Sequence, residues 1–89
     1  MPTDTFSTTS DSPIAPAQDC FAIAPDDNAE LSKVTKAIYI GAGGDVVVRA
    51  LRAEADVVFR DVPSGYILDI RAIAVRANGT TATDLVGLA

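Results

Sequence analysis

The chain has 89 residues, of which 48% are hydrophobic, and a formal net charge of −5. A domain of this size buries only ~60% of the surface that its unfolded chain exposes, so disulfides, metal ions or partners usually supply further stability. With one cysteine and no histidine, an intrachain disulfide is excluded and the usual zinc ligands are missing, which leaves association as the expected source of stability.

The negative charge is concentrated in the first third of the chain. Residues 1–30 carry six acidic and no basic side chains, whereas residues 31–89 carry six acidic and seven basic ones. Binding to phosphate backbones requires clustered Lys and Arg, so we expect no nucleic-acid partner. The amino terminus has no basic and apolar leader, and no apolar run approaches the ~20 residues of a membrane span. We therefore expect synthesis in the cytoplasm and no insertion into a membrane.

Residues 1–19 have the composition of a flexible arm. Ser, Thr, Asp and Pro dominate, and the large apolar side chains after Met1 are Phe6 and Ile14. Such a segment cannot bury enough apolar surface to offset the entropy of ordering itself. Phe6, Ile14 and Pro16 are the candidates for an arm that a partner's surface orders, and a dangling, solubilising tail is the alternative. Residues 20–89 then form the single folded domain.

The first half of this domain reads as strands interrupted by turns. Residues 20–24 are an apolar run that Pro25 stops, which predicts a first strand. Asp27 followed by Glu30 has the form of a capping box and predicts one short helical turn through Lys33. Residues 36–40 are β-branched and aromatic, and the glycine-rich residues 41–45 predict a hairpin into a valine-rich strand that ends near residue 51.

The second half continues the same pattern. Residues 49–56 are interpreted as a hairpin connection into a strand over 55–60, and Pro63 with Gly65 predicts a tight turn. Residues 66–77 form the longest candidate strand. Asn78-Gly79 is a hairpin signal before a last strand over 83–88. About six short strands with turn chemistry between them predict an all-β fold, a small antiparallel β-sandwich or barrel.

The long candidate strand has apolar residues on both faces. A sandwich that works alone usually shows a cleaner polar face, so the surplus apolar positions indicate a surface buried between subunits. Strand propensity alone is the other explanation of β-branched residues here. The predicted inter-subunit interface consists of Ile67, Ile73, Val75 and Arg71.

Catalytic, cofactor and metal sites are not indicated. Without histidine the commonest proton shuttle and every nucleophile–histidine pair are missing. Cys20 lies in an apolar run and is expected to be an inert thiol in or near the core. Residues 41–44 lack the third glycine and the helix of a dinucleotide loop, and residues 25–30 lack the spacing of a calcium loop. We expect no enzyme, no cofactor and no small-molecule substrate.

From about residue 20 onward the sequence resembles the head spike base proteins of bacterial gene transfer agents and their tailed-phage relatives. Five pieces carry the resemblance in this order: Pro25-Asp26 with Leu31, Thr35-Lys36-Ala37-Ile38-Tyr39-Ile40-Gly41, Gly44-Asp45-Val46-Val47-Val48, Val58-Phe59-Arg60-Asp61-Val62-Pro63-Ser64-Gly65, and Ile70-Arg71 with Gly79-Thr80-Thr81-Ala82-Thr83. Each piece alone consists of residues that are common in turns and strands. The order and spacing of the five pieces make the match specific. The charged connection over 49–54 departs from the expected pattern.

The resemblance implies a β-subunit on the surface of a virion-like particle. Its partners would be four further copies in a pentamer, the major capsid protein at a fivefold vertex, and a spike fibre that helps attachment to recipient cells. It brings no catalytic residues with it. The alternative function is a small carbohydrate-binding β-sandwich module, which would present exposed aromatic rings, and this chain has no Trp and only Tyr39 and Tyr66 as tyrosines.

Overall fold

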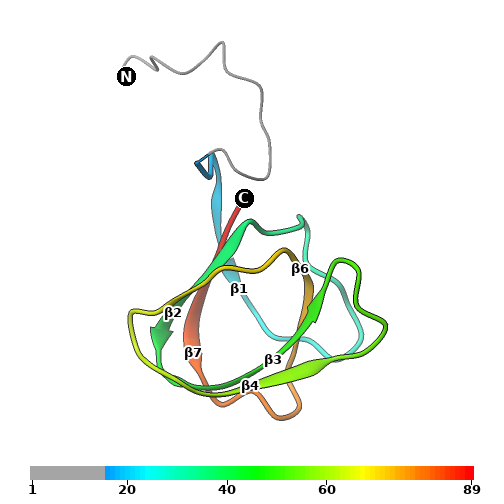
Figure 1. Cartoon of the computed structure of the whole chain (residues 1–89), viewed down its shortest axis with the longest axis vertical. Helices are drawn as coiled ribbons and strands as arrows, with labels where there is room; N and C mark the ends of the chain where they lie inside the picture. The colour runs from blue at the N-terminus through cyan, green and yellow to red at the C-terminus, as the bar shows by residue number, and fades with distance from the viewer. Residues whose placement is uncertain (1–15) are drawn as a thin grey trace.

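The computed structural model describes residues 16–89, which form seven β-strands and no helix (Figure 1). The strands are β1 (Cys20–Ile23), β2 (Ala37–Ala42), β3 (Gly44–Ala50), β4 (Val57–Val62), β5 (Ile67–Leu68), β6 (Ala72–Arg76) and β7 (Thr83–Leu88). The all-β prediction is therefore confirmed.

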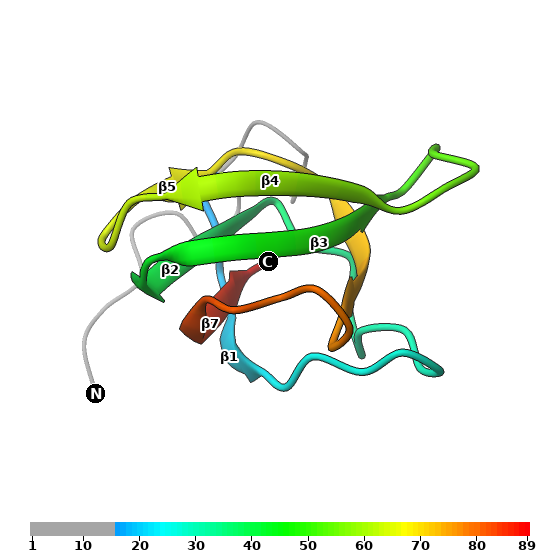
Figure 2. The same cartoon turned by 90° about the horizontal axis from the view of Figure 1, so that it is seen from below.

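The strands build two antiparallel sheets that face each other as a sandwich. One sheet has four strands in the order β1-β7-β2-β5, and the other has three in the order β4-β3-β6. Figure 2 shows the paired strands β3 and β4 running side by side along the length of the second sheet. Both ends of the described chain lie at one end of the molecule, where β1 and β7 pair along four residues each.

The core lies between the sheets and is made of aliphatic side chains. Ile38 and Ile40 of β2 and Val46 and Val48 of β3 are fully buried, and they meet from opposite sheets. The remaining core residues are Ile23, Val62, Leu68, Ala72, Val75, Ala82 and Leu85. Because the side-chain period of a strand is two, these inward positions fix which residues face outward.

The predicted helical turn is wrong, although its capping chemistry is present one residue earlier. The Asp26 carboxylate accepts hydrogen bonds from the amides of Asn28 and Ala29, at 2.8 and 3.2 Å. The segment then stays irregular because its backbone bonds to β6: Leu31 donates to the Ile73 carbonyl at 2.7 Å. Hydrogen bonds to β6 are more favourable here than a single helical turn. Nucleation of a helix is unfavourable, and one turn adds too few hydrogen bonds to offset that free energy.

Two predicted hairpins are connections between strands of different sheets. β2 and β3 follow each other through Gly43 but belong to different sheets, and a Cβ on Gly43 would lie 2.5 Å from the Val62 carbonyl oxygen. Asn78-Gly79 also forms a turn, between β6 and β7, which do not pair. Local turn chemistry specifies the reversal of the chain, whereas the partner of each strand is set by the core. The connection over 51–56, by contrast, joins the paired strands β3 and β4 and is a hairpin as predicted.

The long strand predicted over 66–77 is two strands in different sheets. β5 pairs with β2 and β6 pairs with β3, with a break over residues 69–71 between them. The tight turn before β5 is confirmed. Tyr66 donates to the Pro63 carbonyl at 3.2 Å, and Gly65 has φ of 79°, which is the value at the third residue of a type II turn.

The buried hydroxyl of Thr35 leads to a prediction about stability. This residue is fully buried, and its hydroxyl donates to the Ile70 carbonyl at 2.9 Å and accepts from the Ala72 amide at 3.0 Å. Thr35→Val leaves both backbone groups without these partners, so we expect a loss of about 2 kcal/mol in the free energy of unfolding. Urea denaturation measures it.

Two control variants accompany this measurement. Thr35→Ser keeps both hydrogen bonds and loses one methyl group, with an expected cost of about 1 kcal/mol. Thr83→Val, at an exposed position of β7, should change stability by less than about 0.5 kcal/mol. Equal stabilities of Thr35→Val and the wild type would contradict the role of the hydroxyl.

Candidate functional site

The outer face of the four-stranded sheet is apolar across its whole width. Ala22, Val86, Tyr39 and Ile67 lie opposite one another from β1 through β7 and β2 to β5, in a continuous cross-strand row. They point away from the core because their neighbours along the strands point into it. Ala22, Tyr39 and Ile67 are exposed, and Val86 is half-buried. We call this row, together with Leu88, the outer apolar face.

A second row extends the same surface. Cys20, Leu88 and Ala37 lie opposite one another on β1, β7 and β2. Asp84 is the acidic residue on this surface. A Cβ on Gly41 of β2 would lie 2.6 Å from the Asp84 Cβ on β7, so positions 41 and 84 lie on the same face of the sheet. The outward positions of the four strands thus include one charge among otherwise uncharged residues.

The outer face of the three-stranded sheet has a different character. Arg60 on β4 pairs with Asp45 on β3, and Arg76 on β6 pairs with Asp56, both at 3.3 Å. Charged, partly solvated pairs of this kind are typical of a face that meets water. Contiguous apolar surface on a small protein marks a contact with another macromolecule, so the outer apolar face is the candidate functional site.

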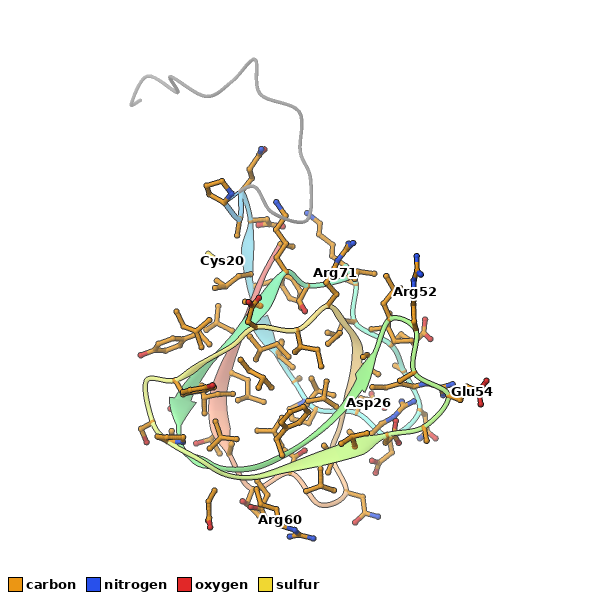
Figure 3. All side chains as sticks on the ribbon, viewed as in Figure 1. Cys20, Asp26, Arg52, Glu54, Arg60 and Arg71 are labelled. Carbon is orange, nitrogen blue, oxygen red and sulfur yellow. The ribbon has the colours of Figure 1, made fainter. Side chains whose placement is uncertain are left out.

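The structure separates the four predicted interface residues. Ile67 is exposed on the outer apolar face, and Arg71 is exposed outside the strands, near the chain ends (Figure 3). Ile73 is half-buried, and its carbonyl accepts the bond from Leu31. Val75 belongs to the core with 1% of its surface exposed, so it has no surface to offer a neighbour. The prediction grouped these residues on one face because it treated β5 and β6, which belong to different sheets, as one strand.

Two residues missed by sequence reasoning, Tyr39 and Val86, form the centre of the site. The alternation of residues along β2 and β7 indicates that both side chains face outward. Ile38 and Ile40 face the core with Tyr39 between them, and Leu85 faces the core next to Val86. An apolar residue in an outward position could be recognised only once the inward positions were known.

The end of the molecule where Pro16 and Ala89 lie is polar. The amides of Gln18 and Asp19 donate to the Ala89 carbonyl at 2.7 and 2.8 Å, which extends the β1–β7 pair. Pro16 is exposed, and its carbonyl accepts a bond from Lys36 Nζ at 3.2 Å. The other two predicted arm residues, Phe6 and Ile14, lie outside the described residues. Lys33 pairs with Asp19 at 2.5 Å.

This ion pair changes the acidity of Asp19. The hydrogen bond from Lys33, and next its charge, hold the pKa of the Asp19 carboxyl below its usual value. A depressed pKa means that the pair contributes above the unfolded-state pKa and is lost as the pH falls through the lowered folded-state pKa. The pair is solvent-exposed, so its effect is local to the end of β1.

Residues 16–89 hold no group of three or more His, Cys, Asp or Glu side chains that could bind a metal ion. This part of the chain forms no helix, and so none that is long and apolar enough to cross a membrane. Cys20 is exposed on β1, which corrects its predicted place in or near the core. The two tyrosines do not form a shared platform for a sugar: Tyr39 lies on the outer apolar face, whereas Tyr66 lines a groove between β4 and β5.

These features define a class of protein: a small antiparallel β-sandwich whose distinguishing surface is an apolar sheet face. The chain is similar to a chain of a solved structure described as "Capsid of native GTA particle computed with C5 symmetry" (GTA, gene transfer agent). The two are 33% identical, with a TM-score of 0.87, and the match covers 98% of this chain and 100% of the other. The chain belongs to the same family as this GTA particle component. No protein-family model and no curated protein matches the sequence.

The lowered pKa of Asp19 gives a prediction about pH. In Lys33→Met the pKa of Asp19 should rise toward the ordinary aspartate value, because the hydrogen bond and the charge that lower it are removed. An NMR titration of the Asp19 carboxyl carbon measures the change. Arg60→Met, at the opposite end of the molecule (Figure 3), is the matched control and should leave Asp19 unaffected. An unchanged midpoint in Lys33→Met would refute the assignment.

Proposed function

We propose that this chain is a structural subunit of a gene-transfer-agent particle, and that five copies form the base of a head spike on a capsid vertex. The observation that carries the proposal is the full-length similarity to a component of a GTA capsid computed with C5 symmetry. The role needs no catalysis, and the chain has no histidine, the commonest proton shuttle.

The physical properties of the subunit support assembly. A domain this small, without a disulfide, gains rigidity when sister copies cover its apolar surface. The outer apolar face is the surface that such a contact would cover. A ring of five on a vertex also matches the symmetry of its support, so each copy meets the same local environment.

The partners follow from this arrangement. The major capsid protein lies beneath the ring, and a spike fibre used in attachment to recipient cells lies on top. We propose that the amino-terminal residues with Phe6, Ile14 and Pro16 contact the capsid, since the chain ends leave the domain at one end of the molecule (Figure 1). Five weak arms on one vertex gain avidity that a single arm lacks.

Imaging of particles tests the location. Particles are purified from cells with and without this chain, and their capsids are reconstructed by cryo-electron microscopy. We expect five-copy density at the vertices only when the chain is present, with lower adsorption of particles to recipient cells when it is absent. Restoring the chain should restore both. Density at another position, or particles that never contain the chain, would refute the proposal.

The arm gives a separate prediction. Deletion of residues 1–15 should reduce occupancy of the particle at least tenfold, because five anchoring contacts are lost together. The hydrogen bonds of Gln18 and Asp19 to Ala89 remain, so the β-sheet circular dichroism should be unchanged. The paired substitution Phe6→Ala and Ile14→Ala should act in the same direction, whereas the matched control Thr5→Ala and Ser12→Ala should not. Full occupancy after the deletion would contradict an anchoring arm.

A further inference from the structure

We infer that residues 3–9 of one copy add as a strand to the free edge of β1 in the next copy, so that each amino-terminal arm joins two neighbours of the ring. The inference rests on the proposed function and deepens it by naming the contact that the arm makes between copies. In this arrangement Ile14 and Pro16, which lie nearer to the domain along the chain, contact the capsid, and Phe6 contacts the neighbouring subunit.

The outer side of β1 presents backbone groups that no described residue binds. β1 is the last strand of its sheet, and Figure 2 shows it beside β7 on the side of the molecule away from β4. Asp19 and Ala89 exchange two amide-to-carbonyl hydrogen bonds of 2.8 Å each, so this pair begins the β1–β7 ladder. Because bonded and non-bonded pairs alternate in an antiparallel ladder, the amides and carbonyls of Cys20 and Ala22 point away from β7. They form a template for a further strand.

The other three sheet edges are protected in the part of the chain that the structure describes. The amides of Asp26, Leu31 and Thr35 donate to carbonyls of β6, so the irregular segment that holds them covers that edge. β5 has two residues, and β4 carries the exposed charges Arg60 and Asp61, with φ of 53° at Asp61. Natural sheets prevent edge-to-edge pairing by covering segments, short strands, charges and local breaks. Within residues 16–89, β1 is longer than β5, has no charge and has no covering segment.

The composition of the arm suits a strand on this edge. Residues 3–9 contain four threonines and one phenylalanine, which are residue types that favour strands. Pro2 and Pro13 enclose a stretch without proline, so every residue between them has the amide that a ladder requires. A segment with so few large apolar side chains becomes ordered when a partner supplies the contacts. Because the other edges of a second folded domain are protected, the arm is the part of this chain that fits.

The arm leaves its own domain on the side opposite to this edge. The Pro16 carbonyl accepts a hydrogen bond from Lys36 Nζ at 3.2 Å, and Lys36 directly precedes β2. The Gln18 amide donates to Ala89 at the end of β7, which lies between β1 and β2. The chain before β1 therefore runs over β7 toward β2, and it would have to reverse to reach its own edge. The edge of a neighbouring copy is reached without such a reversal.

The length of the arm suits a contact between adjacent copies. Residues 10–15 extend by at most about 20 Å, which is comparable with the two shorter dimensions of the molecule, 27 and 18 Å. Residues 3–9 of one copy can thus lie on the edge of an adjacent copy but not on that of a more distant one. The arm and the β1 edge are different surfaces, so their contact is head to tail, and its repetition by a rotation closes a ring.

A proline at position 22 tests the backbone contact. Ala22→Pro removes the amide hydrogen that faces the free edge and leaves the bonds between β1 and β7 in place, because proline is tolerated where the amide of an edge strand faces solvent. We expect an unchanged β-sheet circular dichroism of the isolated chain and an occupancy of particles that falls at least about tenfold, since the arm contacts of a ring are lost together. Ala22→Val keeps the amide and adds a side chain of similar size, so this matched control should occupy particles like the wild type.

Cross-linking on assembled particles tests which edge the arm occupies. Cys20 is a native, exposed thiol on β1, and Thr5→Cys adds a second thiol on the arm. A short bis-maleimide should link the chains of this variant into a ladder from two to five, whereas the wild type, with Cys20 alone, should give none. The matched control moves the thiol from the edge to an exposed position between β6 and β7, by Cys20→Ser with Asn78→Cys in the Thr5→Cys chain, and should also give none.

The outcomes separate this inference from the proposed function. Full occupancy by the Ala22→Pro chain, or a Thr5→Cys chain that is linked only within itself, would overturn the inference and leave the proposed function intact. Equal losses of occupancy for Ala22→Val and Ala22→Pro would assign the effect to the side chain and also overturn it, as would a ladder from the Asn78→Cys control. If Ala22→Pro loses its β-sheet circular dichroism, the cross-link decides. Absence of the chain from particles would remove the proposed function, and the inference with it.

Discussion

The packing of Ile38 and Ile40 against Val46 and Val48 is the contact on which the rest of this structure depends. These four side chains come from opposite sheets and are fully buried, in a chain that has no disulfide to hold the sheets together. Burial of each such side chain contributes about 1.5–3 kcal/mol, so the group supplies much of the cohesion available to a domain of this size. The two strands are consecutive in the chain, and Gly43 lets the backbone pass from one sheet to the other.

The same contact decides what the protein shows to its surroundings. Once Ile38 and Ile40 face inward, Tyr39 must face outward, and the pairing of β2 with β5 and β7 places it in a row with Ile67 and Val86. The other sheet places arginine and aspartate outward and forms ion pairs there. The molecule therefore has one face suited to a neighbour and one suited to water.

A supporting role in a particle follows naturally from this asymmetry. The proposed role requires a fixed shape and surfaces that fit neighbouring proteins of the particle. Family membership with a GTA capsid component connects that physical role to a biological one. Assembly would also cover apolar area that a solitary domain leaves in contact with water, so stability and function would depend on the same contact.

The sequence by itself determined the fold class, the positions of most strands, the turn before β5 and the absence of histidine chemistry, because these depend on local periodicity and composition. It did not determine which strands pair. Gly41–Gly44 and Asn78-Gly79 indicate reversals equally well whether the next strand joins the same sheet or the opposite one, and the residues over 66–77 alternate without showing the break at 69–71. Those choices depend on contacts between distant residues, and only the tertiary structure decided that Val75 belongs to the core and Tyr39 to the surface.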